Sequence, residues 1–166
     1  DNDCSGSVPA SESDGDSDGY LACSGFVERN ASDSVVGGND CDTTSGTTFP
    51  GAAQNETPAS SCRKDSDDDG YGDDTVSGSA VAGTDCNDAA SYVSPAASEV
   101  CDGYDNNCNG TLPGSEVDSD SDGYLGCGSF TDRSGADAIL GGNDCAASSN
   151  VTFPGAAPND SSSSCM

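Results

Sequence analysis

The feature that most constrains this chain is an alternation of acidic residues ending in glycine, which occurs as a tandem pair of loops in two places 104 positions apart. In one pair, positions 1, 3, 5, 6 and 12 of a twelve-residue loop are Asp105, Asn107, Asn109, Gly110 and Glu116, and two residues later the pattern restarts with Asp118, Asp120, Asp122 and Gly123. The other pair consists of Asp1, Asp3, Ser5, Gly6 and Glu12, followed by Asp14, Asp16, Asp18 and Gly19. Oxygen donors at alternate positions of a tight loop turn toward one centre, so this spacing predicts sites for hard cations.

The spacing is that of the EF-hand loop, in which calcium takes six to eight oxygen ligands at roughly 2.3–2.6 Å. Position 8 of such loops is usually apolar, and here it is Val8, Leu21, Leu112 or Leu125. A fifth, less regular loop lies between the two pairs and contains Asp65, Asp67, Asp69 and Gly70, with Asp73 at position 9. We therefore expect about five or more Ca²⁺ ions per chain. The competing interpretation is a solvated acidic coil, because Asp- and Gly-rich linkers match single copies of this pattern by accident.

Three of the loops lack an acidic residue at position 12. The loops that begin at Asp14, Asp65 and Asp118 have Gly25, Val76 and Ser129 there, so a later carboxylate must close each site. The best candidates lie beside the next cysteine and are Asp40 or Asp42, Asp85 or Asp88, and Asp144. Glu28 and Asp132 are the alternatives.

The composition excludes a conventional hydrophobic core. The formal net charge is −26, from 30 acidic and 4 basic residues, and Leu, Ile, Val and Phe together number only 19 of 166 residues. That share is well below the roughly one-fifth under which highly charged chains are expected to be disordered. Metal ions and ten cysteines remain as sources of order, since metal binding energy contributes to folding. The predicted fold is a small disulfide-rich, calcium-stabilised tandem repeat, mostly loops and turns with a few short β-strands and almost no helix.

The cysteines are expected to form disulfides. Their number is even, the chain has no His, and no two are spaced C-x2-C to C-x4-C, which argues against zinc or iron–sulfur sites. Disulfides place the protein outside the reducing cytosol. Sequential pairing satisfies the internal repeat and gives Cys4–Cys23, Cys41–Cys62, Cys86–Cys101, Cys108–Cys127 and Cys145–Cys165.

The chain divides into repeat A (1–62), a shorter repeat B (63–104) and repeat A′ (105–166). A and A′ share the sequences GGNDC, at 37–41 and 141–145, and FPGAA, at 49–53 and 153–157. Gly, Ser, Asp and Asn dominate and no 3.6-residue apolar period exists, so we expect almost no helix. Short strands are expected around 26–27, 35–36, 130–131 and 139–140. The tyrosines that follow glycine in the acidic motifs are interpreted as packing residues of a small core.

The stretch 85–110, with Cys101-Asp102-Gly103-Tyr104-Asp105-Asn106-Asn107-Cys108 near its end, and the following loop 118–124 resemble the MopE-like metal-binding repeats of secreted bacterial proteins. The Asp loops are also similar to thrombospondin type 3 and dockerin calcium repeats. The resemblance covers most of the chain and implies an extracellular, calcium-dependent stalk or spacer. Copper binding, associated with the namesake of the family, relies on nitrogen ligands. It is not carried over, because this sequence has no His and no Trp.

The sequence predicts a structural repeat of a stalk, surface layer or fibril, with a calcium-dependent adhesin or glycan-binding module as the alternative. An enzyme is not expected, because the chain has no His, no activated Ser or Cys arrangement and little core to exclude water. Strong acidity argues against nucleic acid and against anionic membranes, and no apolar run approaches a membrane span.

Two further expectations concern glycans and assembly. Sequons occur at Asn30, Asn55, Asn109, Asn150 and Asn159, so attached glycans are an open alternative to plain hydrophilic loops. The chain starts with Asp, which we expect of a mature or trimmed product, and both ends fall inside the repeat pattern. Repeat faces exposed at both ends predict head-to-tail association into a filament or array.

Overall fold

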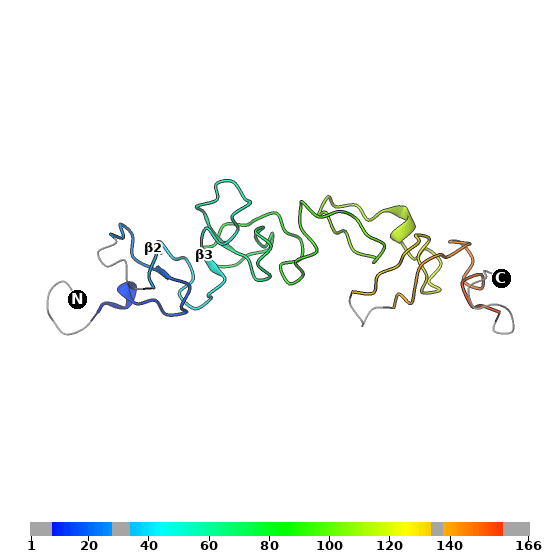
Figure 1. Cartoon of the computed structure of the whole chain (residues 1–166), viewed down its shortest axis with the longest axis horizontal. Coiled ribbons are helices and arrows are strands. Elements are labelled where there is room, and N and C mark those ends of the chain that lie inside the picture. Colours follow the sequence, from blue (N-terminus) through cyan, green and yellow to red (C-terminus); the bar gives the residue numbers. More distant parts are fainter. Residues whose placement is uncertain (1–7, 28–33, 134–137, 158–166) are drawn as a thin grey trace. The chain divides into compact units, whose positions relative to one another are not determined.

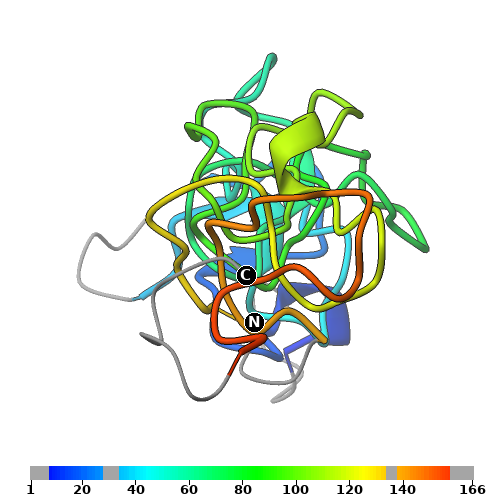
Figure 2. The same ribbon diagram turned by 90° about the vertical axis from the view of Figure 1, so that its right-hand side faces the viewer.

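The computed structural model describes residues 8–27, 34–133 and 138–157, and it forms two compact units, 1–95 and 96–166. The described residues contain no α-helix and consist mainly of turns and bends, as Figures 1 and 2 show. This confirms the predicted class of a small, disulfide-rich protein made mostly of loops. No helix among the described residues is long and apolar enough to cross a membrane.

The first unit contains the four strands found among the described residues. The 3-10 helix η1 (Ala10–Glu12) precedes β1 (Tyr20–Leu21), which pairs in parallel with β2 (Gly37–Gly38). The third strand, β3 (Thr48–Pro50), pairs antiparallel with β4 (Cys62–Lys64). The β2 and β3 strands are labelled in Figure 1.

The second unit contains η2 (Gly114–Glu116) and repeats the β1–β2 contact as a single parallel bridge between Tyr124 and Gly141. These two residues lie 104 positions after Tyr20 and Gly37, the first residue pair of the β1–β2 register. In both A-type repeats, therefore, the GGNDC segment pairs with the tyrosine that follows the Asp loop.

The predicted strand positions were wrong. The structure has no strand at 26–27, 35–36, 130–131 or 139–140. Val36 and Leu140 are 67% and 69% exposed, so their apolar side chains do not direct strand formation. The pairing occurs one residue later, at glycines. A Cβ on Gly37 would lie 2.4 Å from the ring of Tyr20, so only glycine allows this approach.

Apolar burial is small among the described residues. The buried hydrophobic side chains are Leu21, Ala53 and Val93 in the first unit and Cys101 and Leu125 in the second. Two stacked ring pairs, Tyr20–Phe49 and Tyr124–Phe153, add to this packing and support the interpretation of these tyrosines as core residues. Six carboxylates are buried as well, namely Asp40, Asp65, Asp85, Asp88, Asp102 and Glu116. A fold that buries so many acids for so little apolar area needs a source of positive charge.

Disulfides connect segments within each unit. Cys41–Cys62 joins residues 21 apart and agrees with the sequential prediction. Cys101–Cys127 joins residues 26 apart and shows that the predicted pairs Cys86–Cys101 and Cys108–Cys127 were wrong. The reason is that the segment after Cys127 returns to Cys101, where the amide of Thr131 donates to the carbonyl of Cys101 (2.8 Å).

The remaining cysteines are only partly described. Cys86, Cys108 and Cys145 are also disulfide-bonded. Cys23 has a free thiol, so the predicted Cys4–Cys23 bridge is not formed here, and Cys4 lies outside the described residues. Cys127, the equivalent of Cys23, pairs with Cys101 and not with Cys108, the equivalent of Cys4. Cys165, the predicted partner of Cys145, lies outside the described residues.

Candidate metal centres

Three Asp loops share one backbone conformation. The position-1 carboxylate accepts one hydrogen bond from the position-4 amide and another from the position-6 glycine amide, and the first residues of the three loops are Asp14, Asp65 and Asp118. Position 4 is left-handed, with φ of 71° at Ser17, 61° at Asp68 and 63° at Ser121. The glycine at position 6 is also left-handed, with φ of 87° to 91° in the three loops. The first Asp thus shapes the loop, and the glycine is required by the turn.

Each carboxylate at positions 3 and 5 has at least one buried oxygen that lacks a hydrogen-bond donor. The other oxygen of Asp120 accepts from the amide of Ser149 (2.6 Å). In each loop one oxygen of the position-5 Asp accepts from the amide of the tyrosine two residues later, at 2.7–2.8 Å. At positions 3 and 5, the buried oxygens without a hydrogen-bond partner are both oxygens of Asp16 and of Asp67, Oδ1 of Asp120, and Oδ2 of Asp18, Asp69 and Asp122. In each loop the carboxylates at positions 1, 3 and 5 can offer ligand oxygens within 4.8 Å of one another.

These oxygens fit a bound cation. A buried carboxylate oxygen without a donor costs free energy, and a hard cation supplies the missing partner. The donor set is entirely oxygen, which suits calcium, magnesium or manganese rather than softer metals. The residues of these loops therefore fit the calcium ion that the sequence pattern predicts.

A carboxylate distant in sequence, here called the closing Asp, lies beside each loop. The backbone amides of Asp40, Asp85 and Asp144 donate to the carbonyls of Leu21, Gly72 and Leu125, at 2.8–2.9 Å. Each of these carbonyls belongs to position 8 of its loop. The Oδ1 of the closing Asp then accepts from the amide two residues later. The backbone contact between position 8 of the loop and the later segment thus places one of the predicted closing acids beside each loop.

The structure distinguishes between some of the alternative closing residues. Asp42 lies beside Asp40, but its Oδ1 accepts from the Thr44 hydroxyl (2.7 Å) and so caps the following turn. Asp85 and Asp88 both reach the middle loop, where their oxygens and those of Asp67 can lie within 4.8 Å of one another. Asp132 is exposed, and Glu28 lies outside the described residues.

The electrostatics of these centres reflect crowded acids. Burial, with smaller contributions from the neighbouring Asp69, Asp67 and Asp88, raises the pKa of Asp85 to about 6. Burial and neighbouring carboxylates also raise the pKa values of Asp18, Asp40, Asp65, Asp67 and Asp122. The ionised state is therefore disfavoured without a cation, and a bound divalent ion reverses this preference.

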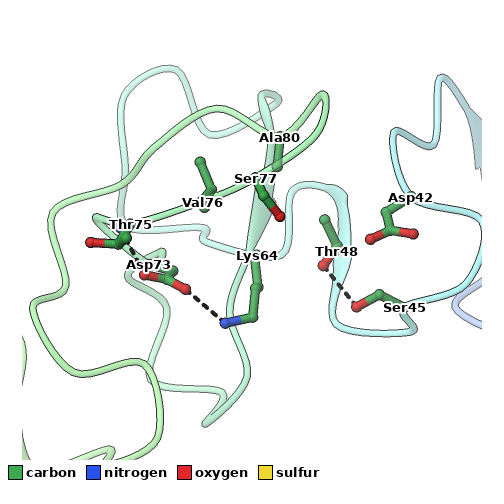
Figure 3. Close-up of a pocket in the computed structure, with 9 residues that line it drawn as sticks. All are labelled: Asp42, Ser45, Thr48, Lys64, Asp73, Thr75, Val76, Ser77 and Ala80. Carbon is green, nitrogen blue, oxygen red and sulfur yellow. Dashed lines mark hydrogen bonds and ion pairs between the residues drawn. The ribbon is translucent and has the colours of Figure 1, made fainter.

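The middle centre contains a cation from the chain itself. The Lys64 amine lies 2.7 Å from Oδ2 of Asp73 and 2.5 Å from Oδ2 of Asp88. Figure 3 shows Lys64 and Asp73 among the residues that line a pocket of about 240 Å³. Hydrogen bonds to the two carboxylates raise the pKa of Lys64. Asp73, predicted as a calcium ligand at position 9, instead pairs with this amine. Burial raises the pKa of Asp73, but the hydrogen bonds from Lys64 and from the Thr75 amide, together with the Lys64 charge, outweigh it, so the pKa is lowered.

The Asp105 loop has the same backbone but different donors. The carboxylate of Asp105 accepts from the amides of Asn109 (3.2 Å) and Gly110 (2.7 Å), and the left-handed positions are Cys108 and Gly110. The amide oxygens of Asn107 and Asn109 are each engaged by a backbone amide of the loop. With one carboxylate at positions 1, 3 and 5, this loop is a weaker candidate than the other three.

Glu116, predicted to close the Asp105 loop, lies in a different environment. Its Oε2 accepts from the amides of Asp102 and Gly103, both at 3.4 Å, and burial raises its pKa, with Asp102 and Glu99 as the neighbouring acids. The structure therefore places Glu116 beside the Cys101–Tyr104 turn.

The other predicted ligands are less informative. Glu12 is exposed at the end of η1. Asp1, Asp3 and Ser5 lie outside the described residues.

Sequence reasoning missed two functional candidates. Lys64 could have been found because it is the only lysine of a strongly acidic chain and directly precedes an Asp loop. The buried Asp102 pairs with Arg133 (3.2 Å) and accepts from the side-chain amide of Asn106 (3.1 Å). No local spacing signals this second arrangement, since Arg133 is 31 residues away.

Comparison with known proteins supports the same conclusion. No curated protein and no solved structure matches the chain significantly. Residues 1–9, 40–57 and 85–112 match the copper-binding MopE family model, whose description is "Putative metal-binding motif". These segments include the closing acids Asp40 and Asp85 and most of the Asp105 loop. The chain therefore carries the MopE-like metal-binding motif in three segments, as its sequence indicates.

Proposed function

We propose that this protein is an extracellular calcium-binding structural repeat, in which ions and disulfides replace the hydrophobic core. The observation that carries the proposal is the set of buried, donor-free oxygens at positions 3 and 5 of three loops with the same geometry. An acidic coil has no reason to bury carboxylates in the same way three times. A calcium ion at each centre would be held by the position-1, -3 and -5 acids and the closing Asp, and would supply the charge that these buried acids require.

Calcium is favoured over copper by the donors. The three loop centres offer carboxylate oxygens, the chain has no His, and its only methionine is Met166. The sulfurs of Cys86 and Cys108, which lie near Asp85, are held in disulfides. Copper sites use imidazole and sulfur ligands, whereas calcium prefers many oxygens in a tolerant geometry. We therefore do not propose copper, which appears in the name of the family model, as the metal of this chain.

A structural role is favoured over an enzymatic one. Acids of the three loops engage the loop backbone or face the loop centre. The disulfides fit an oxidising, extracellular compartment. A stalk, surface layer or fibril subunit uses such rigid repeats as spacers.

The experiment compares two neighbouring residues of the middle loop. Asp67 has both oxygens buried without donors, whereas Asp68 is exposed. Asp67→Asn and Asp68→Asn each remove one negative charge from the same loop. Isothermal titration with calcium at physiological salt is expected to show a loss of about tenfold or more in affinity at one site for Asp67→Asn and little change for Asp68→Asn.

The proposal fails if the two variants lose affinity equally, because calcium would then be a diffuse counterion. It also fails if copper, and not calcium, protects the protein from proteolysis. A matched magnesium titration separates calcium preference from general divalent binding.

A further inference from the structure

Three charged residues distinguish the middle loop from its two relatives. Lys64 lies directly before the loop, Asp73 lies at position 9, and Asp88 follows the closing Asp85 by three positions. The corresponding residues of the Asp14 loop are Ser13, Ala22 and Thr43, and those of the Asp118 loop are Val117, Gly126 and Ala147. None of these six residues is charged, so among the three loops only the one that begins at Asp65 has the three charged residues.

These three side chains meet at the Lys64 amine, which lies 2.7 Å from Asp73 and 2.5 Å from Asp88. Asp88 is buried, and its other oxygen accepts from the amide of Ser66 (2.8 Å). The carboxylate is therefore fixed from both sides. It also belongs to the group, with Asp67 and Asp85, whose oxygens can gather around one ion.

A cation at this group would share the single carboxylate charge of Asp88 with the Lys64 amine. We propose that Lys64 is a built-in competitor for Asp88 and thereby sets the calcium affinity of the middle site below the value that its carboxylates alone would give. The inference rests on the proposed function, because it requires calcium at this loop. A fixed ammonium group beside the site both neutralises part of the carboxylate charge of Asp88 and repels an incoming dication.

Removal of the amine tests the competition. Lys64→Met keeps the apolar stem on β4 and removes the charge. Full-length, disulfide-bonded protein labelled with ¹⁵N is titrated with CaCl₂ at physiological salt. The amides of Gly19, Gly70 and Gly123 serve as reporters, since each donates to the first Asp of its own loop at 2.9–3.1 Å.

In Lys64→Met, the calcium concentration at the midpoint of the Gly70 shift is expected to fall about tenfold, which is the effect of one nearby unit charge on a dication in a well-screened site. The midpoints of Gly19 and Gly123 are expected to stay unchanged. Arg133→Met is the control, because it also removes one positive charge but from the pair with Asp102. It is expected to leave Gly70 unchanged.

The opposite results overturn the inference. An unchanged or higher Gly70 midpoint in Lys64→Met, with Gly19 and Gly123 still responding, means that Lys64 only supports the fold. If none of the three glycines responds to calcium in the unmodified protein, the proposed function itself fails.

A measurement on the unmodified protein avoids any folding defect of the variant. Because Lys64 is the only lysine, ¹³C-lysine labelling gives one Cε signal. That signal is expected to shift with the midpoint of Gly70. A Lys64 signal that stays fixed while Gly70 responds overturns the competition.

Discussion

Replacement of Asp85 by Asn is expected to change stability in opposite directions with and without calcium. Asp85 is fully buried, and burial followed by the charges of Asp69, Asp67 and Asp88 raises its pKa from 3.8 to about 6. Each pH unit is worth about 1.4 kcal/mol. The ionised carboxylate therefore costs the metal-free folded protein about 3 kcal/mol at neutral pH.

Asn keeps the oxygen that accepts from the Asn87 amide (2.9 Å) but cannot ionise. Asp85→Asn is therefore expected to raise the free energy of unfolding of the chelated protein by up to about 3 kcal/mol at pH 7. The same change removes a carboxylate from the calcium centre. It is expected to weaken calcium binding at the middle site by about tenfold or more, and so to reduce the stabilisation that calcium gives.

The assay is denaturant unfolding at pH 7 with disulfides intact, in EDTA and in excess calcium. The control is Asp74→Asn, which removes one charge from an exposed residue of the adjoining segment, whose backbone amide donates to the Asp85 carbonyl (2.8 Å). It is expected to have little effect in either condition. If Asp85→Asn destabilises the protein equally with and without calcium, Asp85 is a structural hydrogen-bonding residue and the reasoning is refuted.

Three further predictions follow from pH, the second disulfide and the β1–β2 contact. Because burial raises the pKa values of several loop acids, the folded metal-free protein is stabilised below pH 3.8 and loses that stability as pH rises to about 6. Saturating calcium is expected to reverse this dependence of stability on pH, and melting temperatures from pH 3 to 8 check the sign. Replacing both Cys101 and Cys127 by Ala, which opens a loop of 26 residues, is expected to cost roughly 3.5 kcal/mol in calcium-loaded protein, and a loss below about 1 kcal/mol would contradict the chain-entropy reasoning. Gly37→Ala places a Cβ against the Tyr20 ring, so it is expected to lower stability by about 1–3 kcal/mol and to weaken calcium binding at the Asp14 loop. Gly114→Ala, whose Cβ has no atom within 4 Å, is the neutral control in the same calcium titration.

The sequence predicted the local part of each centre well. The alternation of Asp with a glycine at position 6 defines the loop, and the structure forms the same turn at Asp14, Asp65 and Asp118. This succeeds because the position-1 carboxylate organises amides only three and five residues away. A short pattern contains all the residues that such a turn needs.

The non-local parts could not be predicted in the same way. Asp40 and Asp42 are equivalent by sequence spacing, and only the hydrogen bond from the Asp40 amide to Leu21 distinguishes them. The pairing of Cys101 with Cys127 likewise depends on a return of the chain that no periodicity encodes.

The predicted strands failed for a related reason. They were placed on apolar residues such as Val36, whereas the contact is made at glycines that let two backbones approach. In a chain with so few large apolar residues, hydrophobicity is a poor guide to backbone pairing. Backbone hydrogen bonds and buried carboxylates determine where segments meet.

The most direct test of the central claim is a crystal structure of calcium-saturated protein with anomalous difference density. The account predicts an ion at each of the three loop centres, within roughly 2.3–2.6 Å of the carboxylates at positions 3 and 5 and of Asp40, Asp85 or Asp144. Ions found only on outer surfaces would contradict it. The same holds if the buried oxygens of Asp16 and Asp67 and Oδ1 of Asp120 are found paired with protein donors and not with metal.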